Sequence, residues 1–273
     1  MKRKIAIAAG VAAAVVAIIV AFIAWPRGAS PVTESEALEA FRARTETPSP
    51  AGAASTTTTA APATTAGAPS LPAFGVYAFA ATGGEEVKLG LLPSESRTYP
   101  ASVPVTVAGA TGSCFTVTLN LLEPHTEDTT YCATSDGTLQ IQSHTKHQRI
   151  GAVSPTAEMT CNPGLLYRPG GPSQSLECKL SLSSGPAQMS ATAKATATAT
   201  ATSAQAGGAT IPAIKLEVTY TFSGDITGSW TERTWFATDR WLPLRIEREL
   251  DMKGLATFKE SSTLNLSSIE PRR

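Results

Sequence analysis

The sequence predicts an all-β domain of mostly antiparallel strands, arranged as a curved sheet, a half-barrel or an open barrel, preceded by one transmembrane helix and a disordered linker. Three observations predict this: an uncharged apolar run near the N-terminus, a low-complexity segment after it, and alternation of apolar and polar residues through nearly all of the remainder. The chain of 273 residues therefore divides into a cytoplasmic tail at 1–4, a span at 5–25, a juxtamembrane helix and linker at 26–72, and a β-rich domain at 73–273.

The first element is a membrane anchor. Residues 5–25 carry no charge, and a helix of that length covers a hydrocarbon core of about 30 Å. A cleaved signal peptide is the alternative, but its apolar region usually spans only about 7–15 residues and ends at a small-x-small site. Three of the first four residues are basic, whereas only Arg27 follows the span closely. Basic flanks stay in the cytoplasm, so we expect a single-pass protein of the cell membrane with an extracytoplasmic C-terminal domain.

A short helix and a linker follow the anchor. Residues 33–44 are rich in helix formers, with Thr33 or Ser35 as the cap, and such a helix either docks on a surface or forms only transiently in water. Residues 45–72 are nearly all Ala, Thr, Pro, Ser and Gly, with too few large apolar side chains to fold. A flexible linker of this length spans on the order of 30 Å. We therefore expect the β-rich domain to stand clear of the bilayer.

The first half of the β-rich domain contains strands marked by alternation. Apolar residues recur at every second position over residues 115–121, and the alternation resumes at 139–141 after a turn at 135–137. Residues 187–202 alternate Ala with Thr, a pattern typical of a low-complexity loop or of a long edge strand. A strand leading to a turn at Gly207-Gly208 is favoured, because a structureless loop of about 20 residues is uncommon inside a compact domain.

The last four strands are predicted to form a meander. Alternating segments at 216–222, 227–236, 242–249 and 258–264 are separated by turn residues such as Gly224-Asp225. In each segment one face is apolar and the other is polar or charged. A sheet of this kind curves over a core on its apolar side.

The cysteines predict two disulfides. All four, Cys114, Cys132, Cys161 and Cys178, lie in the extracytoplasmic part, where an even number is typical of an oxidising compartment. Their spacing lacks the close pairs of a zinc site, so no metal is expected. Sequential pairing, Cys114 with Cys132 and Cys161 with Cys178, is favoured because each pair spans one hairpin-sized loop. Loop entropy gives each bond about 3 kcal/mol.

The histidines are not predicted to be functional. His125 lies beside Glu123, Glu127 and Asp128, but Pro124 and the polar neighbours predict an exposed turn. The other two histidines of the chain are His144 and His147. These two would share one side only on a helix, and the region is predicted to be strand and turn.

The sequence contains no motif of an enzyme or of nucleic-acid binding. It has no G-x-S-x-G turn, Walker loop or H-E-x-x-H helix. Its formal net charge is zero and its charged residues form no basic cluster. We therefore expect no catalytic residues, no cofactor and no nucleic-acid partner.

Two stretches carry a resemblance to known proteins. GVYAFAATGGEEV at 75–87 and TERTWFATDRWLPLRIERE at 231–249 together resemble poorly characterised exported proteins of actinobacteria. The second stretch resembles the tryptophan, turn, proline and arginine hairpin of half-barrel proteins akin to lipoprotein carriers. Such carriers pack helices under the sheet, and this chain shows no clear helices for that position. The resemblance implies a curved sheet whose concave apolar face holds an acyl chain or another hydrophobic ligand.

Two functional hypotheses follow. The first is a membrane-anchored extracytoplasmic protein that binds a lipid or other hydrophobic ligand. The residues expected on its binding face are Tyr220, Phe222, Phe236, Leu244, Ile246 and Phe258. The second is a cell-envelope scaffold or protein-interaction module without a small-molecule ligand, since an alternating apolar face is also what any folded sheet requires.

Overall fold

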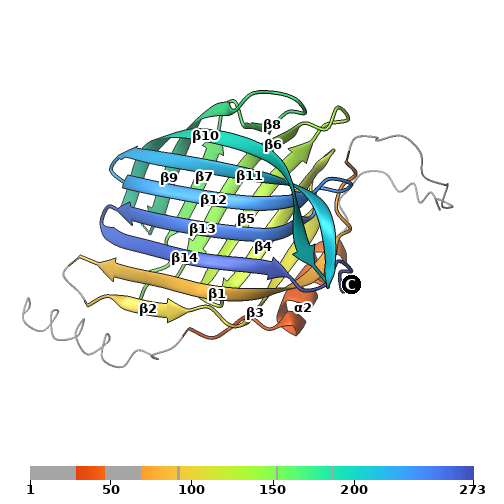
Figure 1. Ribbon diagram of the computed structural model, residues 1–273. Coiled ribbons are helices and arrows are strands. Elements are labelled where there is room, and N and C mark those ends of the chain that lie inside the picture. Colours follow the sequence, from red (N-terminus) through yellow and green to blue (C-terminus); the bar gives the residue numbers. More distant parts are fainter. Residues whose placement is uncertain (1–28, 47–68, 91–92, 152, 186) are drawn as a thin grey trace, which may run out of the picture.

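The protein is an antiparallel β-barrel with one helix on its outer surface in the part of the chain that the structure describes (Figure 1). The computed structural model describes residues 29–46, 69–90, 93–151, 153–185 and 187–273. The predicted cytoplasmic tail, the predicted span and most of the linker lie outside these residues. Within them, no helix combines the length and the apolar character needed to cross a bilayer.

The elements are one helix and fourteen strands. They are α2 (Glu34–Glu46), β1 (Gly75–Leu89), β2 (Glu95–Thr98), β3 (Ser102–Gly109), β4 (Cys114–Leu122), β5 (His125–Ala133), β6 (Leu139–Gln148), β7 (Thr156–Cys161), β8 (Leu165–Tyr167), β9 (Gln174–Ser184), β10 (Ala187–Ala206), β11 (Ala209–Gly224), β12 (Thr227–Ala237), β13 (Pro243–Lys253) and β14 (Ala256–Leu266).

Twelve of these strands close into a barrel. The other two strands are not part of this ring: β2 pairs only with β1, and β8 pairs only with β6. Around the barrel each strand therefore pairs with the next one along the chain, with β2 skipped between β1 and β3 and β8 skipped between β7 and β9. The barrel closes where β1 meets β14, in a register that runs from Phe79 opposite Leu266 to Leu89 opposite Ala256. The predicted half-barrel or open barrel is therefore wrong, although the all-β antiparallel class is confirmed. Alternation within a strand shows which of its faces is buried. It does not show whether the first and last strands of a sheet pair with each other.

Glycines allow the closing strands to approach each other. Gly83 in β1 has φ +102°, and a Cβ built on it would lie 2.0 Å from the carbonyl oxygen of Ser261 in β14. Gly228 in β12 has φ +133°, and a Cβ built on it would lie 2.1 Å from the carbonyl oxygen of Asp251 in β13. These positions require glycine because any larger residue would push the paired strands apart.

Side chains alternate between the barrel interior and its outer surface. In β10, Ala191, Ala193, Ala195 and Ala197 are buried, while the residues between them, Thr192, Lys194 and Thr196, are exposed. The strand predicted there is confirmed, but it is not an edge strand, because it pairs with both β9 and β11. The meander of β11 to β14 is also confirmed.

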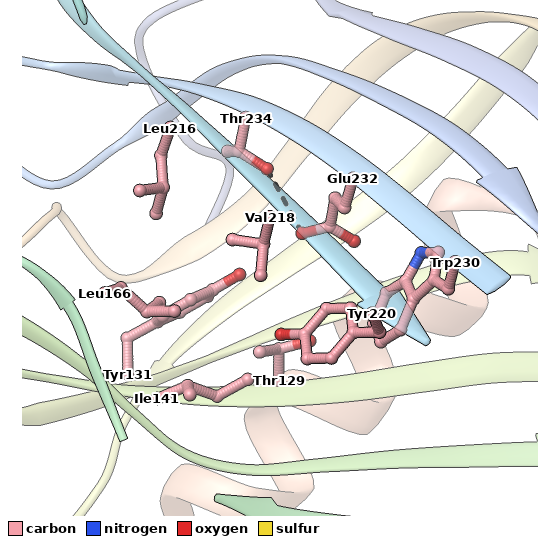
Figure 2. A pocket seen from close by; sticks show the side chains of 10 residues that line it. All are labelled: Thr129, Tyr131, Ile141, Leu166, Leu216, Val218, Tyr220, Trp230, Glu232 and Thr234. Atoms are coloured by element: carbon pink, nitrogen blue, oxygen red, sulfur yellow. Dashed lines mark hydrogen bonds between the residues drawn. The ribbon is translucent and has the colours of Figure 1, made fainter. Parts of the chain in front are cut away.

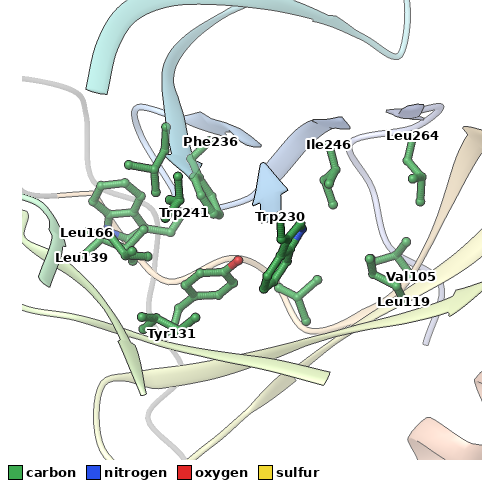
Figure 3. Packing of buried hydrophobic residues seen from close by; sticks show 14 of the residues in the cluster. Val105, Leu119, Tyr131, Leu139, Leu166, Trp230, Phe236, Trp241, Ile246 and Leu264 are labelled. Atoms are coloured by element: carbon green, nitrogen blue, oxygen red, sulfur yellow. The ribbon is translucent and has the colours of Figure 1, made fainter. Parts of the chain in front are cut away.

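The two ends of the barrel differ. The far end lies where β12 passes to β13, and it is filled by the aromatic cluster of Tyr131, Phe236 and Trp241, whose neighbouring ring centroids lie 5.4–5.9 Å apart (Figure 3). Trp241 is fully buried. We call the opposite end, where the β9–β10, β11–β12 and β13–β14 hairpins turn, the mouth end.

Helix α2 packs on the outside of β1 and β3 near the far end (Figure 1). Thr33 caps it, since its hydroxyl accepts the Glu36 N–H while the Glu36 carboxylate accepts the Thr33 N–H. Ala37 and Phe41 are buried against Val76. The helix predicted after the span is therefore docked on the barrel, and the linker connects two parts of one packed unit. Because α2 precedes the linker and is itself docked, the linker does not set the distance between the barrel and the predicted span.

Both predicted disulfides are present. Cys114 is bonded to Cys132 across β4 and β5, and Cys161 to Cys178 across β7 and β9. In each case the two residues stand directly opposite each other, with Cα atoms 4.0 Å apart. The sequential pairing is confirmed.

Candidate ligand-binding cavity

A cavity of about 360 Å³ occupies the mouth end of the barrel. Its wall is almost entirely apolar, and its lining residues come from β1, β6, β7, β9 to β14 and the hairpins between them. Representative wall residues are Met159, Leu180, Leu182, Phe222, Leu250 and Phe258. Two rim residues, Val153 and Leu255, are the exposed large hydrophobic residues of the described chain, at 39% and 64% exposure.

The floor of the cavity is polar. His144, Lys146, Gln148 and Arg248 line it, and all four point inward from β6 and β13. Their side chains are largely buried; that of Lys146 is 13% exposed and that of Arg248 only 2%. The Lys146 ammonium lies 3.9 Å above the ring of Phe258, which places this cation at the boundary between floor and wall.

Beneath the floor, buried charges form a layer across the barrel. Glu85 in β1 accepts hydrogen bonds from Arg97 at 3.0 Å and from Gln148 at 2.8 Å. His125 in β5 lies between two carboxylates, with Nδ1 2.5 Å from Glu85 and Nε2 2.6 Å from Glu127. Because both ring nitrogens face carboxylate oxygens, the ring is an imidazolium that donates to both.

The layer continues toward β13 and β14. Glu127 accepts from Arg248 and, at 2.9 Å, from Lys146. Glu260 in β14 accepts from the same two cations, from Arg248 at 2.8 Å and from Lys146 at 3.2 Å. Each buried carboxylate is thus paired with at least two cationic groups, as burial of charge requires.

The pKa values of these groups reflect the pairing. Burial by itself would raise the pKa of Glu85, but the hydrogen bond and charge of His125 outweigh it and lower this pKa to about 2. Burial would likewise lower the pKa of His125, yet its hydrogen bonds to Glu127 and Glu85 raise it. Nε2 of His144 lies 3.7 Å from Glu127, too far for a hydrogen bond, and burial outweighs this charge and lowers the pKa of His144 to about 4. At neutral pH, His125 is therefore charged and His144 is neutral.

A small void lies beside this layer in the middle of the barrel (Figure 2). Its volume is about 10 Å³, the size of a single water molecule. Glu232 lines it and accepts from Thr234 at 3.2 Å. Burial raises the pKa of Glu232, with Arg248 opposing. Tyr220 lies across the void and stacks on Trp230, with ring centroids 4.8 Å apart.

The charged layer contains one cluster with the spacing of a metal site among the described residues. Single ligand atoms of His125, Glu127 and Glu260 lie within 4.8 Å of one another. Both carboxylates are already paired with Arg248 and Lys146, and a cation bound there would have to displace these partners. The cluster is therefore explained as part of an ion-pair network.

The six residues predicted on the binding face lie in three different parts of the barrel interior. Phe222 and Phe258 line the cavity, while Tyr220 lines the small void. The other three, Phe236, Leu244 and Ile246, are buried in the filled interior.

The prediction that His125 lies in an exposed turn is wrong. The turn is confined to Glu123 and Pro124, and β5 begins at His125, which is fully buried. His144 and His147 do point to opposite sides of β6, as a strand requires, with His144 buried and His147 exposed.

A signal for the charged layer was present in the sequence. Arg248 is in phase with Leu244 and Ile246, and Glu85 is in phase with Phe79, so alternation places both charges inside. The same signal applies to Glu260. A charge at an inward position of an apolar face is the informative exception.

Comparisons with protein-family models, curated proteins and solved structures find no match for this chain.

Proposed function

We propose that the protein binds a hydrophobic small molecule or acyl chain in the cavity at the mouth end of its barrel, as a membrane-anchored protein on the extracytoplasmic side. The observation that carries this proposal is an apolar cavity of about 360 Å³ in a barrel whose far end is fully packed. Protein interiors contain few voids larger than a water molecule. The cavity falls within the range of about 300–1,000 Å³ found for small-molecule sites.

The chemistry of the wall supports an apolar ligand. Methionine, leucine and phenylalanine side chains make up most of it, and they offer dispersion contacts without hydrogen bonds. The charged floor is already paired internally, so it closes the cavity without requiring a charged ligand group. The extracytoplasmic location is supported by the two disulfides, which persist in oxidising compartments.

The scaffold hypothesis has less support. A scaffold needs a folded barrel but no cavity, and its interior would be filled throughout as the far end is. No feature of the described residues favours a protein interface in the way that the cavity favours a ligand.

Native mass spectrometry of the full chain, released from nanodiscs made with host lipids, tests the proposal. Ala157 lines the cavity, and Ala157→Phe would fill part of it. Ala209 is exposed in the β10–β11 hairpin at the far end of the barrel, so Ala209→Phe is the matched control. We expect wild type and Ala209→Phe to carry a bound apolar molecule, and Ala157→Phe to carry about tenfold less.

Two results would contradict the proposal. One is a wild-type protein without bound mass after incubation with the host lipid extract. The other is equal occupancy in all three proteins, which would mean that the molecule binds elsewhere. Near-UV circular dichroism of each variant checks that the barrel is folded.

A further inference from the structure

The first described residues lead from α2 to the mouth end of the barrel. Ala29 packs against the barrel core, and the Ser30 carbonyl accepts the Glu123 N–H at 2.8 Å in the β4–β5 turn. The Pro124 carbonyl in that turn accepts the Arg149 N–H at 2.7 Å. The next residue, Ile150, lines the cavity. The chain therefore joins the barrel beside the mouth, while α2 lies toward the far end.

This attachment fixes how far the barrel can lie from the predicted span. Only residues 26–28 separate the end of the span at Trp25 from Ala29. Three extended residues reach about 10 Å. The β4–β5 turn must then lie close to the end of the predicted span, and the later Ala/Thr/Pro-rich segment has no influence on that distance.

The rim of the mouth has the surface expected of a membrane contact. Val153 and Leu255 are the exposed large hydrophobic residues of the described chain, and both lie on the rim. They come from two separate connections, β6–β7 and β13–β14, so their location at one end is not a consequence of sequence proximity. Exposed apolar groups gathered at one site mark an interaction surface.

From these observations we propose that the mouth of the barrel lies against the outer surface of the lipid bilayer, with Val153 and Leu255 in its interfacial layer. The cavity then opens toward the lipid, and a hydrophobic ligand enters from the bilayer without crossing water. The contact with the bilayer rests on the predicted span at 5–25, while the route of the ligand rests also on the proposed function.

Site-specific labelling of the full chain in phosphatidylcholine nanodiscs tests the orientation. All four cysteines of the chain are paired, so a substituted cysteine provides a single free thiol for an environment-sensitive nitrobenzoxadiazole label. Leu255→Cys and Val153→Cys report on the rim. Ala209→Cys, on the far-end hairpin, is the matched control.

We expect blue-shifted emission at the two rim positions and quenching there by a spin label on the lipid chains, with neither effect at position 209. Water-like emission at both rim positions would overturn the orientation. Release of the chain from membranes by alkaline carbonate would instead show that the span is absent, and the inference would fail with it. Ligand occupancy is measured separately by mass spectrometry, so failure of the proposed function is distinguishable from both results.

Discussion

Replacing Arg248 with methionine should strongly destabilise the barrel. The side chain is 2% exposed and pairs with Glu127 and Glu260, which are themselves almost fully buried. Methionine fills much of the same space but leaves both carboxylates with Lys146 as their shared cation. Removing one partner from a buried ion pair costs about 3–5 kcal/mol. For a domain of this size that free energy lowers the Tm by about 6–20 °C.

The loss should be smaller in acid. Burial would raise the pKa of Glu127, but Arg248 and Lys146 outweigh it and hold this pKa well below its usual range. A carboxylate whose pKa is lower in the folded than in the unfolded chain stabilises the fold at pH values above its unfolded pKa. That contribution is lost as the pH falls through its folded pKa. Without Arg248 the pKa of Glu127 rises, so the variant has less of this contribution to lose. The gap in Tm between the two proteins should narrow as the pH falls below about 4.5, the ordinary pKa of a glutamate.

The matched control is Arg245→Met on the same strand. Arg245 faces outward, its side chain is 41% exposed, and it pairs with Glu247. An exposed pair of this kind contributes about 0–1 kcal/mol, which corresponds to at most about 4 °C. Thermal unfolding followed by circular dichroism measures both variants. Equal losses in Tm would refute the reasoning, as would a double variant Arg248→Met/Glu260→Gln that recovers none of the loss.

Three further predictions concern a glycine at the closing strands, the protonation of His144 and the Cys161–Cys178 disulfide. Gly83→Ala should cost at least about 3 kcal/mol in denaturant unfolding, because its Cβ would lie 2.0 Å from a carbonyl of β14; Gly90→Ala, with open space around it, should cost about 1–2 kcal/mol, and equal costs would exclude strand crowding. Burial lowers the pKa of His144 to about 4, so the neutral ring contributes stability that is lost as the pH falls below 6.5, by about 2 kcal/mol between pH 7.5 and 5; His144→Gln should remove that part of the pH dependence, and an unchanged dependence would contradict the assignment. Replacing Cys161 and Cys178 together with alanine should lower the unfolding free energy by about 3 kcal/mol while leaving a folded barrel, and a variant without near-UV circular dichroism would contradict this.

Local pattern predicted much of the fold. The meander from β11 to β14 followed from alternation and turn residues, because both signals depend only on near neighbours in the chain. The pairing of Cys114 with Cys132 was predictable for the same reason, since the two residues stand opposite each other across one turn. The strand at β10 was predictable because threonine alternates there with a small apolar residue.

Closure of the barrel could not be predicted in this way. It depends on pairing between β1 and β14, which are separated by almost the whole domain, and no local pattern specifies that partner. The docking of α2 was also hidden, because its contact residues Ala37 and Phe41 make a small apolar patch that is typical of a transient helix as well. The cavity required the positions of many strands at once, although Phe222 and Phe258 on its wall were identified from alternation.

The charged layer was missed for a different reason. Arg248 and Glu85 occupy inward positions of their strands, but a single charge in an apolar series was not used as a signal. His125 was placed in a turn because its neighbours are polar, but one of them, Glu127, faces inward beside it and pairs with it inside the barrel. Polar composition predicts exposure only where no complementary partner is available.

The docked helix α2 also determines what a protease could achieve. A cut anywhere between residues 47 and 68 would sever the covalent link between α2 and β1 but would leave Ala37 and Phe41 seated against Val76. Retention of α2 on the barrel would then depend on a two-body equilibrium over a small contact, without the high effective concentration that the intact chain provides. Dissociation of α2 from the barrel would then become more favourable with any change that loosens this contact. In this protein, the association of α2 with the barrel after such a cut would therefore be held by non-covalent contacts alone.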